Sequence, residues 1–505
     1  MTKKGKIVAF DIGAASGRTI TGHFHDDRLV LEEIHRFPIY PVQLQDSLYI
    51  DVLNIWQQIQ IGLQKSIEKY GSQIDSVGVD TWGVDYALLD KKSRLLSNPY
   101  HYRDNRTNAI LERACEKVSL QDVYFQTGNY PLQFNTLFQL YTTRLEQPYL
   151  LDEANSLMML PDLFNFWLCG EKATEYSIAT TTQCFDQVQK KWAHPLLRKL
   201  DIPTGIFQQV LAPGTSLGKI HSRLTPDDND ASIQVILPAC HDTASAVSAV
   251  PLDDPNYLYI SSGTWSLVGV ELSQPLLRTE NMEAEFTNEG SPENITRFLK
   301  IVPGMWLLQQ CKREWELAGK YYTYDDLTQI AAEVRTARSI IDVTDPLFTA
   351  PGPMCERIRY YCLQTGQCVP RTEGEMVKCI LISLSFLYRS LLDNFETILQ
   401  KRINVIHIIG GGSKNALLNQ MTADNCSRPV IAGPQEATAT GNILVQAMGL
   451  GYVNNLNEIR QIVKRSINPI TFYPVSSQIW DEDYARYKKY CTNYSSFQKQ
   501  EDFIR

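Results

Sequence analysis

The chain has 505 residues, 44% of them hydrophobic, and a formal net charge of −8. A chain of this length is too long to fold around a single compact core, so we expect two domains. The apolar content argues against a disordered protein. The acidic balance argues against a nucleic-acid partner bound through a broad basic field, and no run approaches the roughly 20 apolar residues of a membrane span.

The N-terminal segment Met1–Lys6 is basic, as in a signal peptide, but the apolar run behind it breaks at Asp11. We therefore expect no export signal and a cytoplasmic protein. The 11 cysteines are scattered without a CxxC pair, which favours reduced structural thiols over a zinc site or a disulfide framework. One loose cluster leaves a local redox pair open: Cys355, Cys362, Cys368 and Cys379.

The first eighty residues predict strands interrupted by one helix. Short apolar or alternating runs predict strands at 6–10, 18–25, 29–37 and 74–79, and residues 11–17 form a turn rich in small residues. Between residues 52 and 70 the apolar positions recur every three or four residues, and Gly71 follows, which predicts an amphipathic helix. This order is typical of an α/β domain with a mixed sheet.

A similar order recurs in the second half of the chain. Strands are predicted at 257–260, 265–271 and 405–409, with a long helix at 375–400 and another helix at 415–425. The recurrence indicates a weak internal duplication with a boundary near residues 245–255. We therefore expect an N-terminal domain over residues 1–247 and a C-terminal domain over residues 248–505.

Three loops rich in glycine and small residues follow apolar strands, at residues 11–18, 262–264 and 410–413. Backbone N–H groups in such loops can approach a phosphate closely without a basic patch. None has the spacing of a Walker A loop or of a dinucleotide-binding GxGxxG, which argues against a P-loop or NAD enzyme. Singly, each is explained better by a hairpin or a helix cap; in combination, two hairpin loops from two halves could clamp a polyphosphate.

Asp11 ends the first apolar strand, beside the first of these loops. A carboxylate in this place can hold a magnesium ion through water, next to the β- and γ-phosphates of a nucleotide. An Asx turn that closes the hairpin explains the same residue equally well.

A predicted strand at 233–237 leads through Pro238–Thr243 into a small-residue helix at 244–250. Asp242 therefore lies at a helix start near the domain boundary, where it could act as a general base toward an attacking hydroxyl. Position alone favours a simpler role, because an aspartate at a helix N-terminus commonly caps free N–H groups. A structural role is likewise the simpler explanation of His241.

A further polar cluster combines residues 80–85 with residues 102–106 and includes Trp82 and Tyr102. Polar groups beside aromatic rings suit a sugar, whose hydroxyls need hydrogen bonds and whose C–H faces stack on rings. A hairpin turn with a surface ion-pair network is the alternative.

At these motifs the chain resembles the FGGY carbohydrate kinases, from Val8 to about residue 474. The resemblance implies an α/β fold of two actin-like, ribonuclease H-like domains that flank a catalytic cleft, one binding a sugar and the other ATP with Mg²⁺. It is carried by residues 11–18, 33–37, 75–89, 102–107, 134–137, 179–183, 241–247, 261–267, 288–290, 306–309 and 410–412.

The resemblance also implies a role for individual residues. It makes Asp242 the catalytic base, for which capping becomes the weaker explanation, while a structural role for His241 stays open. The nucleotide contacts that it implies are Ala14, Ala15, Ser16, Gly17, Arg18, Thr264, Gln309 and Gly411. The sugar contacts that it implies are Gly83, His241, Asp242 and Thr243.

The reaction implied is transfer of the ATP γ-phosphoryl group to the 1-hydroxyl of a 6-deoxy ketohexose, L-rhamnulose. Asp11 would position Mg²⁺, and loop amides with Arg18 and Thr264 would stabilise the phosphate charge. The partners expected are therefore a small sugar and ATP, with neither a nucleic acid nor a membrane. The oligomeric state is not indicated.

One departure bears on the substrate. Family members that act on L-rhamnulose have an asparagine directly after a Leu-Lys pair in the sugar site, whereas here Leu299-Lys300 is followed by Ile301. Loss of a polar contact can redirect specificity between sugars that differ at one centre, such as L-rhamnulose and L-fuculose at C4. L-Fuculose and L-ribulose therefore stay alternatives, as does, in another class, a non-enzymatic nucleotide-switched actin-like sensor.

Overall fold

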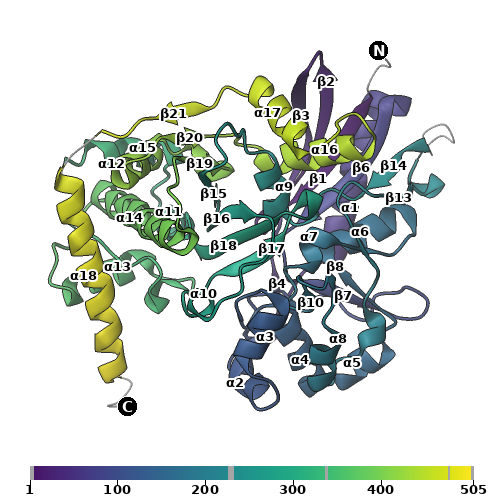
Figure 1. Cartoon of the computed structure of the whole chain (residues 1–505), viewed down its shortest axis with the longest axis horizontal. Coiled ribbons are helices and arrows are strands. Elements are labelled where there is room, and N and C mark those ends of the chain that lie inside the picture. The colour runs from purple at the N-terminus through teal and green to yellow at the C-terminus, as the bar shows by residue number, and fades with distance from the viewer. Residues whose placement is uncertain (1–4, 226–231, 336–338, 476–477, 502–505) are drawn as a thin grey trace. The chain divides into compact units, whose positions relative to one another are not determined.

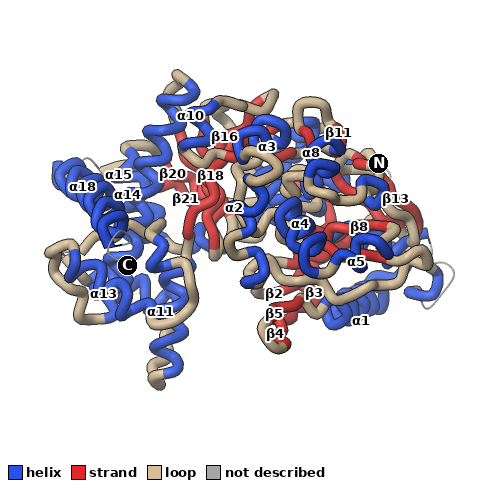
Figure 2. Tube along the Cα trace, turned by 90° about the horizontal axis from the view of Figure 1, so that it is seen from below, coloured by secondary structure: helices blue, strands red, loops and turns tan. Residues whose placement is uncertain are grey.

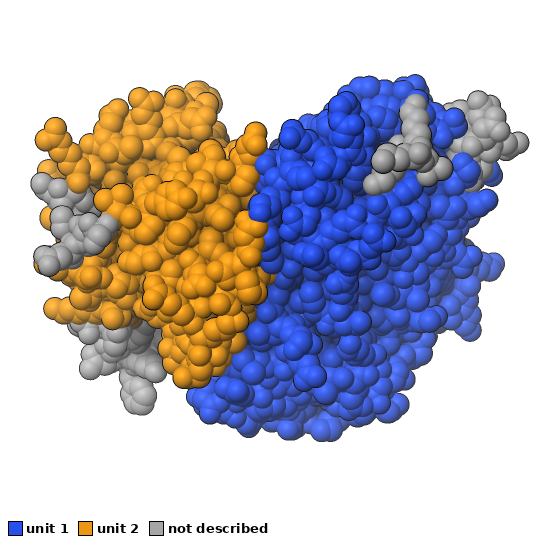
Figure 3. Space-filling view, turned by 45° about the horizontal axis from the view of Figure 1, so that its top comes forward, with its two compact units in different colours: residues 1–252, 271–300, 436–467 blue, residues 253–270, 301–435, 468–505 orange. Residues whose placement is uncertain are grey.

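A computed structural model of the chain describes residues 5–225, 232–335, 339–475 and 478–501. Residues 1–4 of the basic N-terminal segment, which was weighed as a signal peptide, lie outside the described residues. Within these ranges, no helix combines the length and the apolar character needed to cross a membrane. The chain forms two compact units, coloured in Figure 3: unit 1 contains residues 1–252, 271–300 and 436–467, and unit 2 contains residues 253–270, 301–435 and 468–505.

Unit 1 is built on a six-stranded sheet with the strand order β13-β14-β6-β1-β2-β3 (Figure 1). β1 pairs antiparallel with β2 and parallel with β6, and β6 pairs parallel with β14, so the sheet is mixed. The strands are β1 (Lys6–Ile12), β2 (Ser16–His25), β3 (Arg28–Pro38), β6 (Ile74–Thr81), β13 (Ser216–Lys219) and β14 (Gln234–Ile236).

The central strand β1 is buried on both faces. Val8 and Phe10 face one core, which they share with α1 (Val52–Tyr70), and Ile7 and Ala9 face a second core, which they share with α16 (Ala437–Gly449). Alternate residues of a strand point to opposite faces, so a strand covered on both sides has a continuous apolar run, as this one does.

Further elements of unit 1 carry the residues of the site. The helices include α2 (Ile110–Cys115), α3 (Leu120–Thr127), α4 (Thr136–Glu146), α5 (Pro148–Glu153), α6 (Leu160–Cys169), α7 (Tyr176–Ala179), α8 (His194–Lys199), α9 (Asp242–Ser248), α10 (Thr279–Glu283) and α17 (Leu456–Ser466). The strands include β4 (Val42–Leu44), β5 (Ser47–Tyr49), β7 (Tyr86–Leu89), β8 (Ser156–Met159), β9 (Thr174–Glu175), β10 (Phe185–Asp186), β11 (Lys191–Trp192), β12 (Val210–Leu211) and β17 (Thr287–Gly290), which pairs antiparallel with β18 (Thr296–Pro303).

The strands of unit 2 follow the order β16-β15-β19-β20-β21, and its long helix α14 is visible in Figure 2. The strands are β15 (Tyr257–Ser262), β16 (Trp265–Leu272), β19 (Val405–Ile409), β20 (Val430–Ala432) and β21 (Ile470–Phe472). The helices include α11 (Trp306–Leu317), α12 (Tyr324–Glu333), α13 (Met354–Gln364), α14 (Glu373–Leu399), α15 (Ala416–Cys426) and α18 (Gln478–Glu501).

The two units repeat one pattern of strands. In unit 1 the antiparallel hairpin β1–β2 continues through the parallel strands β6 and β14, and in unit 2 the hairpin β15–β16 continues through the parallel strands β19 and β20. A long helix precedes the first parallel strand in each unit: α1 precedes β6, and α14 precedes β19. The predicted α/β class and the internal duplication are confirmed.

Two predicted element boundaries were wrong near the site. β1 extends to Ile12 because Asp11 pairs with Arg18 in the ladder, so Asp11 belongs to the strand and not to the turn. α9 starts at Asp242 and not at residue 244, because the Ala244 N–H bonds to the His241 carbonyl and already closes a helical turn.

Candidate active site

The β1–β2 hairpin positions the first predicted phosphate loop. Asp11 lies opposite Arg18 in the ladder, and the turn over residues 13–16 is closed by a 3.0 Å bond from its first N–H to its last carbonyl. Ala14 and Ala15 form the exposed tip of the turn. Small side chains at the tip leave the backbone open to a ligand.

Arg18 is held by carboxylates on both sides. It forms ion pairs with Asp11 and with Glu436, which immediately precedes α16. Burial opposes the charge of Arg18, but the two carboxylates outweigh it and raise the pKa of the guanidinium. Because the Asp11 carboxylate is engaged with Arg18 across the ladder, an Asx turn does not explain it.

Asp80 is a second buried carboxyl group, in the same part of the sheet as Asp11. Asp11 of β1 and Asp80 of β6 are partners in the parallel ladder between these two strands. Asn442 of α16 donates to one Asp80 oxygen, while the other, Oδ1, is buried without a hydrogen bond to any described residue. Burial and then the charge of Asp11 raise the pKa of Asp80 well above its ordinary value.

The carboxyl groups at the ends of β1 and β6 fit a divalent metal that comes with a nucleotide. Mg²⁺ prefers oxygen ligands and is commonly held by one or two carboxylates together with phosphates and water. Asp11 and the unpartnered oxygen of Asp80 are donors of this kind. Among the described residues, no group of three or more His, Cys, Asp or Glu side chains is placed to hold a metal ion.

The segment that leads into α9 is fixed by its neighbours. The Thr81 N–H at the end of β6 donates to the Cys240 carbonyl, at 3.0 Å. Buried Glu175 accepts the Cys240 N–H on its carboxylate, at 2.9 Å. Asp242, two residues further on, is therefore positioned by the sheet and by the start of α7.

Asp242 is the first residue of α9 and not its N-cap, and its carboxylate accepts one of the free N–H groups at the helix start. The N-cap residue of α9 is His241, and its side chain makes no capping bond. Asp242 Oδ1 accepts the N–H and the hydroxyl of Thr243 at 2.5 and 3.2 Å, and 28% of the Asp242 side chain stays exposed. Burial raises the pKa of Asp242, and the neighbouring His241 opposes this.

The predicted sugar-contact residue Gly83 lies in a polar junction of distant segments. A Cβ at Gly83 would come within 3.1 Å of the Thr181 side chain. The Val84 N–H donates to the Thr181 hydroxyl at 3.3 Å, and the Val84 carbonyl accepts the Thr136 hydroxyl at 2.6 Å. The segments around residues 83, 136 and 181 therefore meet.

Asp85 ties together the two halves of the predicted polar cluster. It is fully buried and accepts the Trp82 indole N–H at 2.8 Å and the Tyr102 N–H at 3.2 Å. Gln139 donates to its other oxygen at 3.1 Å. Burial raises the pKa of Asp85 to about 7. The surface ion-pair network considered as an alternative does not describe this carboxyl, because Asp85 is fully buried and its hydrogen-bond donors are neutral.

Thr264 and Gln309 belong to unit 2. Thr264 lies in the turn between β15 and β16, and its carbonyl accepts the N–H groups of Gly304 and Trp306 at 3.0 and 3.2 Å. These bonds join the turn to the start of α11, which carries Gln309 in its first turn. The two predicted nucleotide contacts are therefore neighbours within this unit.

Gly411 lies in the glycine loop that follows β19, also in unit 2. A Cβ at Gly412 would lie 2.0 Å from the Ser262 hydroxyl, so this loop packs against the end of β15. At Gly411 itself a Cβ would meet no atom within 4 Å. The middle glycine is thus exposed and leaves its backbone accessible.

The structure gathers the predicted site residues in two groups. In unit 1 Asp242 lies close enough to Asp11 for its charge to raise the pKa of Asp11, and Arg18 lies beside Asp11. Thr264, Gln309 and Gly411 form the second group, in unit 2.

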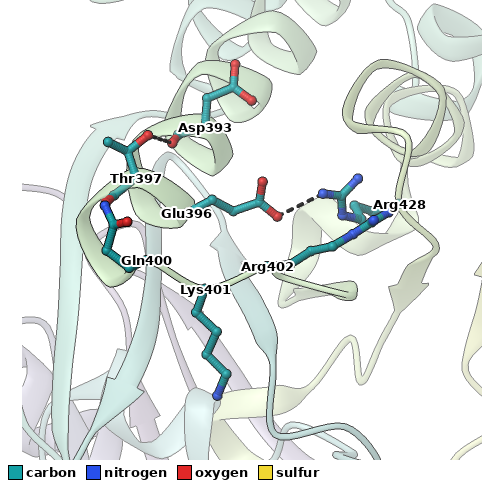
Figure 4. A pocket seen from close by; sticks show the side chains of 7 residues that line it. All are labelled: Asp393, Glu396, Thr397, Gln400, Lys401, Arg402 and Arg428. Carbon is teal, nitrogen blue, oxygen red and sulfur yellow. Dashed lines mark hydrogen bonds and ion pairs between the residues drawn. The ribbon is translucent and has the colours of Figure 1, made fainter.

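Unit 2 also has a surface pocket that contains none of the predicted site residues (Figure 4). It encloses about 650 Å³ at the end of α14. Arg428, which lines it, is bonded to Glu396 at 2.8 Å and to the carbonyls of Ile403 and Ser427. None of the predicted site residues lines this pocket.

Sequence reasoning missed several charged residues at this site. Glu436 lies far from the motifs in sequence, and Glu175 and Arg297 lie outside them, four residues before residues 179–183 and seven residues after residues 288–290. No local pattern marks any of the three. Glu289 was included in a family segment but was given no role. The signal that could have identified it is a glutamate inside a strand that is buried on both faces, where an ionised group needs a charged partner.

Comparisons with known proteins agree with this geometry. The N-terminal domain of the FGGY family of carbohydrate kinases matches residues 6–248, and its C-terminal domain matches residues 258–450. The rhamnulokinase of Bacteroides thetaiotaomicron is 40% identical over 96% of this chain and 99% of its own length. The rhamnulokinases of Oceanobacillus iheyensis and Bacillus subtilis are 38% and 37% identical over 93% and 92% of this chain and 99% and 95% of their own lengths.

Solved structures with low sequence identity share the fold. A xylulose kinase from Lactobacillus acidophilus superposes with a TM-score of 0.77 at 16% identity and covers 98% of both chains. A Plasmodium falciparum glycerol kinase with ADP has a TM-score of 0.78 at 13% identity and covers 97% of both. The expected α/β fold of two actin-like domains is confirmed, and the chain belongs to the FGGY family of carbohydrate kinases.

Proposed function

We propose that the protein transfers the γ-phosphoryl group of ATP to the 1-hydroxyl of L-rhamnulose and so releases L-rhamnulose 1-phosphate and ADP. The observation that carries this proposal is full-length similarity to several curated rhamnulokinases, at 36–40% identity. The reaction belongs to L-rhamnose catabolism, and we place it in the cytoplasm, where ATP is supplied.

Asp242 acts as the general base in this proposal. It accepts the proton of the sugar 1-hydroxyl while the new O–P bond forms and the bond to the β-phosphate oxygen breaks. Phosphoryl transfer has a loose transition state, so the carboxylate mainly needs correct position. The partly exposed carboxylate at the fixed start of α9 supports this role. Gly83, His241 and Thr243 are the other proposed sugar contacts.

The nucleotide is held by backbone amides and a few side chains. We assign this role to Ala14, Ala15, Ser16, Gly17, Arg18, Thr264, Gln309 and Gly411. Asp11 would hold the Mg²⁺ of ATP through water, where the ion neutralises charge on the β- and γ-phosphates. Exposed small residues at positions 14, 15 and 411 support close contact between backbone and phosphate.

We further propose that the chain divides functionally at residues 247 and 248, with sugar and base on the N-terminal side. The matched family domains, at 6–248 and 258–450, support this division.

The identity of the sugar is tested by a coupled ADP-release assay with L-rhamnulose, L-fuculose and L-ribulose. Ile301, in β18, offers no hydrogen bond where family members that act on L-rhamnulose have an asparagine. L-Fuculose, which differs at C4, is therefore the second candidate. We expect the highest kcat/KM for L-rhamnulose, and a clearly higher value for L-fuculose would replace it.

The role of Asp242 is tested by Asp242→Asn, which keeps the shape and removes the base. We expect kcat to fall by roughly 10²–10⁴ with nucleotide binding nearly unchanged. A nucleotide-switched sensor on the same fold needs no base, so wild-type protein that binds ATP without phosphorylating any of the three sugars would favour that function instead.

A further inference from the structure

Within unit 1, a buried network of polar side chains connects to the proposed base through His241. Arg297 of β18 is fully buried, and its Nη2 lies 2.9 Å from Oε2 of Glu289 in β17 and 3.1 Å from Nδ1 of His241. Glu289 Oε2 lies 3.3 Å from the same Nδ1. On the far side of the ring, His241 Nε2 lies 3.4 Å from Asp242 Oδ1. Figure 1 labels β17, β18 and α9, the elements that carry these residues.

The Glu289–Arg297 pair of this network is held in place by the backbone of the β17–β18 hairpin. Glu289 and Arg297 are directly opposite each other in the β17–β18 ladder. Arg297 also donates to the Gly290 carbonyl at 3.2 Å from Nη2 and 3.3 Å from Nε. Burying an ion pair costs about as much desolvation energy as the pair returns, so stability alone explains such a pair poorly.

The contacts of His241 determine which ring nitrogen carries a proton. If Arg297 donates to Nδ1, that nitrogen is bare and the proton of the neutral ring is on Nε2. If Nδ1 donates to Glu289 instead, a bare Nε2 would face the Asp242 carboxylate, so Nε2 must be protonated as well. Both arrangements place an N–H on the side of Asp242.

This N–H completes the set of donors around one oxygen of the base. Asp242 Oδ1 already accepts the N–H and the hydroxyl of Thr243. With His241 added, three donors surround Oδ1, and Oδ2 is the oxygen on which an incoming hydroxyl can place its proton. The two carboxylate oxygens thereby have different tasks.

We propose that Glu289 and Arg297 are positioning residues that orient His241, so that His241 and Thr243 occupy Oδ1 of Asp242 and leave Oδ2 to accept the proton of the sugar hydroxyl. This inference rests on the proposed function, because it presupposes that Asp242 is the base. It assigns no contact with the sugar to Glu289 or Arg297.

The test is a double-mutant cycle on kcat with Glu289→Gln and His241→Phe. The phenyl ring is planar like the imidazole but slightly larger, and it lacks the two nitrogens. We expect it to leave the Glu289–Arg297 pair in place. We expect Glu289→Gln to lower kcat about 10–100-fold when His241 is present and less than about 2-fold when it is absent. Equal losses in the two backgrounds, or none, would overturn the proposal.

The control variant is Glu285→Gln, the same substitution at a half-exposed glutamate that pairs with Lys300 at 3.0 Å. We expect it to leave kcat unchanged. Arg297→Lys, which keeps the charge and loses the planar fork, serves if Glu289→Gln does not fold, and should lower kcat by a similar factor only when His241 is present.

A pH profile separates positioning from general damage. Other titratable groups face this region: Asp11 of β1 and Asp80 of β6 lie close enough for the charge of Asp242 to raise their pKa values, and Tyr176 of α7 lies near Arg297. These are unchanged in Glu289→Gln. His241 partly counteracts the increase in the pKa of Asp242. If Glu289→Gln lets the imidazole ring turn away, the pKa of Asp242 should rise, and the acid limb of the kcat/KM profile should move to higher pH.

A measurement without turnover distinguishes failure of this inference from failure of the proposed function. In ¹⁵N-histidine-labelled protein, the His241 signal, assigned by its loss in His241→Phe, should show a protonated Nε2 and should shift in Glu289→Gln but not in Glu285→Gln. A bare Nε2 overturns the inference even in an active kinase. If no sugar is phosphorylated, the proposed function fails, and the ring signal then tests only whether Glu289 and Arg297 orient His241.

Discussion

At the scale of the residue, the charge of the hydrogen-bond and ion-pair partners distinguishes three buried carboxyl groups: Glu289, Asp85 and Glu175. Glu289 is buried, yet its pKa is lowered, because His241 and Arg297 outweigh the effect of burial. Asp85 and Glu175 are buried among uncharged donors, and burial raises the pKa of each to about 7. A neutral donor compensates desolvation of a carboxylate only in part, whereas a cation can reverse the shift.

Glu175→Gln tests how the path into α9 positions the base. The Glu175 carboxylate accepts the N–H groups of Ser177, Ile178 and Cys240 at 2.7, 3.1 and 2.9 Å. In the glutamine variant, the side-chain NH2 group replaces one of the two carboxylate oxygens and, being a donor itself, cannot accept from the N–H groups that this oxygen served. We expect kcat to fall about 10–100-fold through displacement of Asp242, since small misplacements are costly in catalysis. Steady-state kinetics with saturating sugar and ATP measure it.

The matched control is Glu171→Gln, the same substitution at an exposed position four residues earlier. It should leave kcat within about 2-fold of the wild type, as expected for surface substitutions. Wild-type turnover in Glu175→Gln would show that the segment before α9 is fixed by β6 alone.

At the scale of the element, a close helix crossing supports the start of the catalytic helix. α16 packs directly on α9, and a Cβ at Gly441 would lie 1.8 Å from the Ser245 carbonyl oxygen. Backbone cannot move aside as the end of a flexible side chain can. Glycine at position 441 is therefore required by the short distance between the two helices, and the same helix α16 carries Asn442, the partner of Asp80.

Gly441→Ala should separate α9 from α16. We expect a loss of about 1–3 kcal/mol in the free energy of unfolding, as for other overpacked interiors, together with a lower kcat. Urea denaturation and steady-state kinetics measure the two effects. Gly205→Ala is the control, because a Cβ at Gly205 meets no atom within 4 Å. An unaltered stability of Gly441→Ala would contradict the tight crossing.

Local patterns predicted the elements well and their assembly less well. The helix expected at residues 52–70 and the strand expected at 405–409 coincide with α1 and β19, because amphipathic and apolar periodicity is a local property. The adjacency of Asp11 and Asp80 and the packing of α16 in unit 1 depend on pairings between residues far apart in sequence. No spacing within the chain records such pairings, and the family resemblance supplied the site residues instead.

At the scale of the whole molecule, unit 1 is assembled from three stretches of sequence. Residues 271–300 contribute the hairpin with Glu289 and Arg297, and residues 436–467 contribute α16 and α17. The core around β1 therefore closes only when the last of these stretches is in place. The site residues of unit 1 thus depend on contacts of high sequence separation, which make folding slow compared with a helical protein of the same size.

The contribution of Asp85 and Glu175 to the free energy of unfolding should fall as the pH rises from about 4 to about 7. With pKa values raised to about 7, Asp85 and Glu175 bind protons more tightly in the folded chain than in the unfolded chain, where their ordinary values are 3.8 and 4.5. The folded state therefore holds more protons across this window, and stability contributed by proton binding is lost as the pH rises through the folded pKa.

Urea unfolding of the wild type and of Asp85→Asn at pH 5, 6, 7 and 8 measures this contribution. The variant should have a flatter profile, by an amount of order 2 kcal/mol across the window. Asp152→Asn, at a side chain that is 61% exposed, should keep the wild-type slope. An identical slope in Asp85→Asn would show that the raised pKa of Asp85 is not realised.

The thiols report on the integrity of the whole chain. All 11 cysteines are free in the structure, with Cys115 and Cys368 exposed, Cys491 half-buried and the others buried. The thiolate is the reactive form, and burial raises the pKa of Cys426 to about 12, so buried thiols are both inaccessible and protonated. Ellman's reagent should therefore label two thiols rapidly in the native protein. It should label all 11 in denaturant without reductant, and a smaller number there would reveal a disulfide, for which Cys362 and Cys379 are the first candidates because their thiols share a hydrogen bond.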